Sequence, residues 1–328
     1  MKKVLSLILA LAMVFALVAC GEKQPASDGD ASSDGDKPAR GNVIMTFGTA
    51  DTGGSMYPAG AAVSQVWTNN VEGVKCNTQT STGSFQNCQD VSTGEVDVAV
   101  ATSDVVLNAY NGTGKFADIG KLDNLRVIGA VYTSVLSGVT LKSSGLTYIH
   151  DLLGKRVAVG PAASATENAT LAAFGVMGID SSNTSLENLG LGDGILDAAF
   201  GFAGLPIGGQ LNLAATKEIQ VLDMTQEEID KVLAGNAAYI QTKIPAGTYT
   251  GQDNDANTFG VKCLIIVTAD MDADLVYDLC KAMNEHTEEL AAGNALLKDM
   301  TDPSFLCTQM PIPLHDGAQK YYSEQGLI

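Results

Sequence analysis

Arginine and histidine are scarce in this sequence of 328 residues. Arginine occurs only at positions 40, 126 and 156, and Asp and Glu outnumber Lys and Arg by 37 to 19, so the formal net charge is -18 at pH 7. A nucleic-acid partner needs many cationic phosphate contacts, so we expect no nucleic acid to bind. A binding site in this chain also cannot depend on a cluster of arginine forks.

The motifs of common enzymes are absent as well. No GxSxG, HExxH or P-loop pattern occurs. The three histidines, His150, His286 and His315, lie in polar stretches where we expect exposed side chains. We therefore expect no enzyme, no cofactor and no metal site. An enzyme would need a nucleophile, and the sequence nominates none.

Cysteine is present without a metal-ligand or redox spacing. Besides Cys20 there are five cysteines, at positions 76, 88, 263, 280 and 307, and four of them lie among apolar neighbours, as in VKCLIIV. A bridge between Cys76 and Cys88 would close a short loop in an exported protein. Buried thiols agree better with the apolar neighbours.

The first forty residues read as a targeting segment and a tether. A basic start and an apolar run end in LVAC, which resembles the lipobox of bacterial lipoproteins. Residues 1–19 are then a signal peptide and Cys20 the acylated first mature residue. A transmembrane anchor is the alternative, but the apolar run is shorter than the roughly 20 residues needed to span a bilayer. Residues 20–41 lack large apolar side chains and predict a disordered tether.

From Asn42 onward, short apolar runs alternate with helical patterns. NVIMTFGT, GVKCNTQ, VDVAVAT and LRVIGAVY predict strands in the first part, and RVAVG, GILDAAFGFAGLP and KEIQVLDM predict strands in the second. Strands that alternate with helices indicate an α/β fold with a largely parallel sheet. The length of this part suits two domains.

Three loops rich in small and hydroxyl residues each lie between an expected strand and an expected helix: FGTADTGGSMYP, QTSTGSFQN and GPAASAT. Glycine lets a ligand approach the main chain, and N–H groups at a helix start favour a carboxylate or phosphate. One such loop alone could be an ordinary turn, but three predict an anion or zwitterion site in the crevice between two α/β units. The candidate ligand-binding residues are Thr49, Asp51, Thr52, Gly53, Ser55, Tyr57, Thr82, Ser84, Asn87, Ser164 and Thr166.

Asp51 is the unusual member of this set, because a carboxylate in an anion-binding loop repels an anionic ligand. Either its side chain points to solvent, or it pairs with a ligand ammonium group. The second possibility would make the ligand an amino acid.

Several stretches together resemble the TAXI (TRAP-associated extracytoplasmic immunogenic) solute-binding proteins of tripartite ATP-independent periplasmic transporters. They are GTADTGGSMYPAG, TGSFQNCQDVSTGEVDVAV, DLLGKRVAVGPAASATE, LDAAFGFAGLP, IPAGTYTGQD and IPLHDGAQKYYSEQG, and they keep the family's order over nearly the whole mature chain. Departures lie near the expected cleft: Ala50 and Asp51 replace a Gly-Gly pair, and Ala165 replaces a glycine. An acidic residue and a histidine are missing after Tyr132, which leaves Ser134 and Ser137.

The resemblance implies a two-domain, type II periplasmic-binding-protein-like fold with the ligand cleft between the domains. Domain I would comprise 42–136 and 268–328, and domain II 137–267, with two hinge segments near SGVTLK and CLIIVTAD. The protein would be an extracytoplasmic, lipid-anchored monomer that captures a small carboxylate or a glutamate-like amino acid and delivers it to a TRAP-type permease. Two alternatives stay open: a ligand sensor that signals to a membrane receptor, and an adhesin without a small ligand.

Overall fold

The computed structural model describes residues 41–52, 54–162, 164–189 and 196–328. The signal peptide, Cys20, most of the tether and Gly53 therefore lie outside the described residues. In the described part, no helix is both long and apolar enough to cross a membrane.

Three strand–helix units form what we call the N-terminal group. In each unit a strand is followed by a helix, through a loop after β1 and β2 and directly after β3. The elements are β1 (Val43–Gly48), α1 (Met56–Asn70), β2 (Val74–Gln79), α2 (Ser84–Thr93), β3 (Val98–Thr102), α3 (Ser103–Asn111) and η1 (Gly114–Phe116). Strand β1 pairs in parallel with both β2 and β3, so the three strands end at the same edge of the sheet.

A second set of elements, which we call the middle group, repeats this arrangement. Its elements are η2 (Lys142–Ser144), η3 (Ile149–Leu152), β5 (Arg156–Ala158), α4 (Ala165–Val176), β6 (Ser185–Glu187), β7 (Ala198–Ala203), α5 (Gly208–Ala214), β8 (Ile219–Val221), α6 (Gln226–Gly235) and β9 (Tyr239–Ile244). Here β5 pairs in parallel with β6 and β7.

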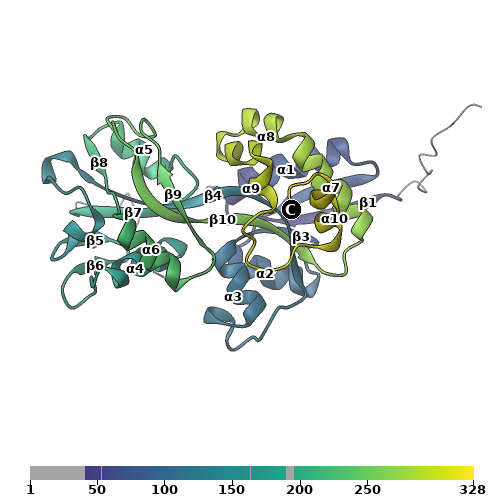
Figure 1. The fold of residues 1–328 in the computed structure, drawn as a ribbon, viewed down its shortest axis with the longest axis horizontal. Coiled ribbons are helices and arrows are strands. Elements are labelled where there is room, and N and C mark those ends of the chain that lie inside the picture. Colours follow the sequence, from purple (N-terminus) through teal and green to yellow (C-terminus); the bar gives the residue numbers. More distant parts are fainter. Residues whose placement is uncertain (1–40, 53, 163, 190–195) are drawn as a thin grey trace, which may run out of the picture. The chain divides into compact units, whose positions relative to one another are not determined.

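Two long strands, β4 (Leu125–Leu141) and β10 (Ala256–Thr268), join the two groups. They pair antiparallel with each other from Leu125 to Val135, and Figure 1 shows them running together from one group to the other. The strand order is β2-β1-β3-β10-β4-β7-β5-β6, with β8 on β4 and β9 on β10. This confirms the expected α/β fold of type II with two crossing segments.

The chain ends in helices that pack beside the N-terminal group. They are α7 (Ala273–Glu285), α8 (Thr287–Gly293), η4 (Ala295–Thr301), α9 (Pro303–Cys307) and α10 (Asp316–Glu324). Trp67 of α1 donates its indole N–H to the Leu279 carbonyl at 3.0 Å, which joins α1 to α7.

The cores follow the two-residue period of the strands. In β3, Val98 and Val100 belong to one apolar cluster, whereas Ala99 and Ala101 belong to another on the opposite face. Both faces of this part of the sheet are covered, because alternate side chains of a strand point to opposite sides. A strand that is buried on both faces has a nearly continuous apolar sequence, and for this reason VDVAVAT predicts a strand.

Along each crossing strand, the buried side chains belong first to the apolar clusters of one group and then to those of the other group. In β4 the change falls between Tyr132 and Val135, and in β10 it falls between Val261 and Cys263. These positions lie a few residues before the hinge segments expected from the sequence. The division into domains 42–136 plus 268–328 and 137–267 remains a prediction.

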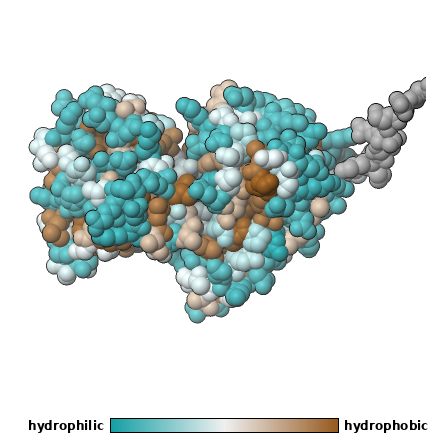
Figure 2. All heavy atoms as spheres, in the orientation of Figure 1, coloured by the Kyte–Doolittle hydropathy of each residue, from teal (hydrophilic) through white to brown (hydrophobic). Residues whose placement is uncertain are grey.

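The expectation of a largely parallel sheet was wrong. All pairings of β4 and of β10 with other strands are antiparallel, because each of these strands runs back past neighbours that point the other way. Among the described strands, parallel pairing is confined to strands within one group. Figure 2 shows a mostly hydrophilic surface on the visible face, with apolar residues in small groups only.

Candidate ligand-binding site

The loop after β1 is held in place by Thr49. Its side chain is buried, its hydroxyl donates to the Gln79 carbonyl at 2.8 Å, and its own carbonyl accepts from Ser81 Oγ at 2.9 Å and Asn87 Nδ2 at 2.6 Å. The hydroxyl hydrogen of Thr49 is therefore already used inside the protein. Thr49 shapes the loop, and its hydroxyl is not available as a donor to a ligand in this conformation.

The other candidates of the first loop lie nearer the surface. Asp51 and Thr52 are exposed, whereas Ser55 and Tyr57 are half-buried. Ser55 precedes α1 in a helical backbone conformation, and its side chain makes no capping hydrogen bond. Of these residues, Ser55 and Tyr57 are the ones placed beside the helix start.

The second loop is brought against the first by Asn87. This buried side chain of α2 donates to the carbonyls of Thr49 and Val100, both at 2.6 Å. A Cβ at Gly48 would lie 3.2 Å from Asn87 Oδ1, so the glycine at the end of β1 gives the amide its space. Asn87 Oδ1 is buried and has no hydrogen-bond partner in the described part of the chain.

The hydroxyls of this loop differ in how they are used. Thr82 is exposed and donates its hydroxyl hydrogen to Gln86 Oε1 at 2.9 Å. Ser84 Oγ instead accepts the Thr102 N–H at 3.0 Å, and its distance to the Thr102 hydroxyl oxygen, whose hydrogen is given to Asp104, is 3.3 Å. An oxygen that accepts still has its own hydrogen to donate. Ser84 is thus a possible donor to a ligand and Thr82 is not.

The third loop belongs to the middle group. Ser164 Oγ accepts from the Glu167 N–H at 3.1 Å and caps α4, and Thr166 Oγ1 accepts from the Phe202 N–H at 3.2 Å. Gly160 has φ of 104°, and a Cβ there would lie 2.7 Å from Thr166, so the loop requires glycine. Ser164 and Thr166 each keep a hydroxyl hydrogen, but their hydrogen bonds stay within the middle group.

The starts of α1 and α2 have free capacity for an anion. Neither helix has a side-chain cap or an acidic residue in its first turn. Among the α-helices of the described chain only the short α5 shares both features, since the others carry a cap, an acid or both. Both helices follow neighbouring parallel strands, so their N–H groups face the same edge of the sheet.

Asp104 is a residue that sequence reasoning passed over. It lies in the first turn of α3, directly after the buried strand β3, and its Oδ1 atom is buried without a hydrogen-bond partner among the described residues. Burial raises the pKa of Asp104, and hydrogen bonds from the Thr102 hydroxyl and the Val105 N–H oppose this rise only in part. The signal available in the sequence was an aspartate two residues after the run VAVAT, near the carboxyl end of a strand.

Other expectations have mixed outcomes. All five cysteines of the described chain are free and buried, so the thiol interpretation is confirmed and the Cys76–Cys88 bridge is not formed.

The expectation that His315 is exposed was wrong. Its ring is buried and Nδ1 accepts the Gly317 N–H at 3.1 Å, because the histidine caps α10. Arg126 and Arg156 lie within β4 and at the start of β5, as expected.

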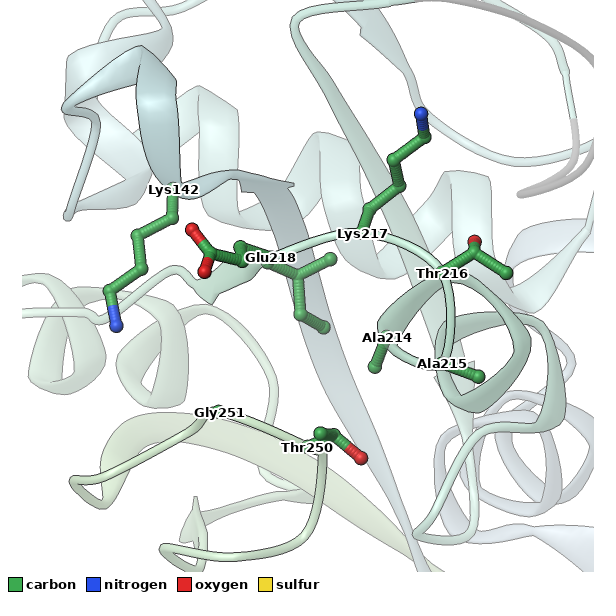
Figure 3. A pocket seen from close by; sticks show the side chains of 9 residues that line it. Lys142, Ala214, Ala215, Thr216, Lys217, Glu218, Thr250 and Gly251 are labelled. Carbon is green, nitrogen blue, oxygen red and sulfur yellow. The ribbon is translucent and has the colours of Figure 1, made fainter.

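One open cavity of about 340 Å³ lies elsewhere, in the middle group. It is lined by Lys142, residues 214–219, Thr250 and Gly251, none of which is a candidate residue. Figure 3 shows the side chains of Lys142 and Lys217 pointing away from each other, and Lys142 lies 3.9 Å from Asp253. Because its charges do not converge, this cavity is not the candidate site.

The model of the NMT1-like family matches residues 47–326. The chain belongs to the NMT1-like family. The matched residues include all three loops and both crossing strands.

Several solved structures are similar to this chain. One is PhnD1 from Prochlorococcus marinus in complex with methylphosphonate, with a TM-score of 0.48, 10% identity and coverage of 87% of this chain and 99% of that chain. Another is the alkanesulfonate-binding protein SsuA from Xanthomonas axonopodis pv. citri bound to MOPS, with a TM-score of 0.47, 13% identity and coverage of 87% and 85%. A substrate-binding protein of an ABC uptake transporter from Streptococcus pneumoniae with bound histidine has a TM-score of 0.43, 13% identity and coverage of 76% and 90%. Likeness at this level does not transfer a ligand to this chain.

Proposed function

We propose that this chain is an extracytoplasmic solute-binding protein that captures a small carboxylate or amino acid and passes it to a membrane permease. The observation that carries the proposal is the pair of helix starts at α1 and α2. Both lack a cap and an acidic residue, and both follow neighbouring strands of one sheet. Their free N–H groups and helix dipoles favour an anionic group of a ligand.

Closure around the ligand would use the two crossing strands. They carry the chain between the N-terminal and middle groups, and a contact already joins the groups away from these strands. Ser103 at the start of α3 donates its hydroxyl to the Ala238 carbonyl, just before β9, at 3.1 Å. Hinge motion about β4 and β10 would open and close this contact, as in other two-domain clamps.

The finer assignment follows the sequence resemblance. We propose a protein of the TAXI branch, anchored through an acylated Cys20 and serving a TRAP-type permease as a monomer, with no catalytic activity. In its site, Ser55, Tyr57 and Ser84 would contact the ligand from one side and Ser164 and Thr166 from the other.

A thermal-shift screen tests this proposal. The full-length protein in mild detergent is unfolded and refolded to remove carried-over ligand, then exposed to amino acids, dicarboxylates and oxoacids. A ligand at about a hundred times its Kd adds roughly 2.7 kcal/mol to stability, a rise of several degrees in Tm. Absence of any shift across the panel would contradict the proposal.

A further inference from the structure

Asp104 lies where elements of both groups meet. Thr102, two residues earlier, pairs with Cys263 of β10 and donates its N–H to Ser84 of α2. Ser103, the preceding residue, hydrogen-bonds the Ala238 carbonyl at the start of β9. The carboxyl group is therefore close to α2, β9 and β10, beside the hydroxyls proposed to contact the ligand.

One oxygen of the Asp104 carboxyl group lacks a hydrogen-bond donor. Asp104 Oδ1 is buried and has no hydrogen-bond partner among the described residues. The groups that do bond the Asp104 carboxyl are a hydroxyl and backbone N–H groups, and no ammonium or guanidinium is among them. An unpartnered buried carboxylate oxygen is costly, so this place lacks a donor, preferably a cationic one.

We propose that Asp104 is a specificity residue that accepts a hydrogen bond from a protonated amine of the ligand. The inference rests on the proposed function and narrows it: the ligand carries an ammonium group as well as the carboxylate expected at the starts of α1 and α2. Plain carboxylates of the same length would leave Asp104 Oδ1 unpartnered and bind more weakly. Asp51 is exposed, so solvent screens its charge, and Asp104 is better placed for this role.

The pH dependence of binding should report on the same group. Burial raises the pKa of Asp104, so it is protonated at a higher pH than an exposed aspartate, and the proton must leave before an ammonium group can bind. The titratable groups that face it are Cys88 of α2, Tyr239 of β9 and Cys263 of β10. Burial raises the pKa of all three, to about 12 for Tyr239 and about 11 for Cys263, so they stay neutral below pH 8.

The test compares ligand pairs that differ only in the amine, such as glutamate with glutarate and aspartate with succinate. Affinities are measured by calorimetry on full-length wild type and Asp104→Asn, with the amine-free member of each pair as the control ligand. We expect wild type to bind the amine member about 10- to 100-fold more tightly, and D104N to lose at least about tenfold for that member only.

The outcomes separate the two proposals. If no compound binds wild type, the proposed function fails and this inference fails with it. If wild type binds a ligand but D104N binds the amine member equally well, only the role of Asp104 is overturned. Should D104N not fold, the wild-type pH profile decides: affinity for the amine member should fall relative to its partner as the pH is lowered and Asp104 becomes protonated, and parallel profiles overturn the inference.

Discussion

The loops before α2 and α4 look alike in sequence but use their polar groups differently. Before α2 the helix start is uncapped, while Asn87 of that helix ties the ends of β1 and β3 together. Before α4 the Ser164 hydroxyl caps the helix and Glu167 occupies its first turn. The start of α2 is thus open for an anion, whereas the start of α4 is satisfied by its own side chains.

This difference shows that the presence of a hydroxyl group in a loop does not by itself make it available to a ligand. What matters is whether its hydrogen is already donated. Thr49 and Thr82 donate theirs internally, whereas Ser84, Ser164 and Thr166 only accept. The expected effects below follow from this division.

The largest effect is expected for Asn87→Ala. The change removes two buried hydrogen bonds, to the carbonyl groups of Thr49 and Val100, of which Thr49 keeps only the one from Ser81 Oγ, and we expect this to cost about 2–4 kcal/mol of unfolding free energy. The matched change in the middle group, Asn188→Ala, removes exposed contacts to Gly160 and Glu167 and should cost about 0.5 kcal/mol. Urea unfolding of both variants measures the difference, and equal costs would remove the distinction between the two loops.

Next in size are the effects of Ser84→Ala and Thr166→Ala on ligand binding. Each hydroxyl that donates to a ligand carboxylate should contribute about 1.5–3 kcal/mol to the binding free energy. Calorimetry with the ligand found in the screen provides the measurement. Thr166→Ser keeps the hydroxyl and should bind like wild type, whereas unchanged affinity in both alanine variants would exclude these hydroxyls from the site.

The fold could be predicted where local pattern and tertiary environment agree. Within VDVAVAT, the residues VAVAT are apolar except for the last and form the fully buried β3. The second half of β4 contains most of SGVTLK, the segment near which a hinge is expected, and that hinge stays a prediction. The serines in this half of β4 are satisfied from distant elements: Ser134 lies 3.4 Å from Cys263 Sγ, and Ser137 donates to Gln210 at 2.7 Å.

The site could be predicted only to the level of loops. Glycine and hydroxyl patterns indicated the correct strand-to-helix turns, but the direction of each hydrogen bond depends on partners such as Gln79 and Phe202, which are distant in sequence. Asp104 was missed for the same reason. An aspartate in a first helical turn is ordinarily a favourable exposed charge, and only the packing around α3 makes it buried.

A smaller effect is expected when a carboxylate is placed at the open helix start by Ser55→Asp. The charge should stabilise the ligand-free protein by about 0.3–1 kcal/mol through the α1 dipole, and it should weaken binding because it occupies the anion site. In α4, Ser164→Asp should give no gain, because Ser164 already caps the helix and Glu167 would repel a second charge. Melting curves and titrations of both variants test this, and a stabilised S55D that binds as tightly as wild type would contradict an anion site at α1.

The smallest effect is expected for Thr82→Ala, although Thr82 is only two residues from Ser84. Its hydroxyl is exposed and its hydrogen is donated to Gln86 Oε1, so its removal should change unfolding free energy by less than about 0.5 kcal/mol and leave ligand affinity unchanged. Affinity titration beside Ser84→Ala gives the sharpest contrast, because the two variants share loop, charge and chemistry. A loss in T82A as large as in S84A would mean that the loop rearranges on binding and that hydroxyl usage in the ligand-free state does not select the donors.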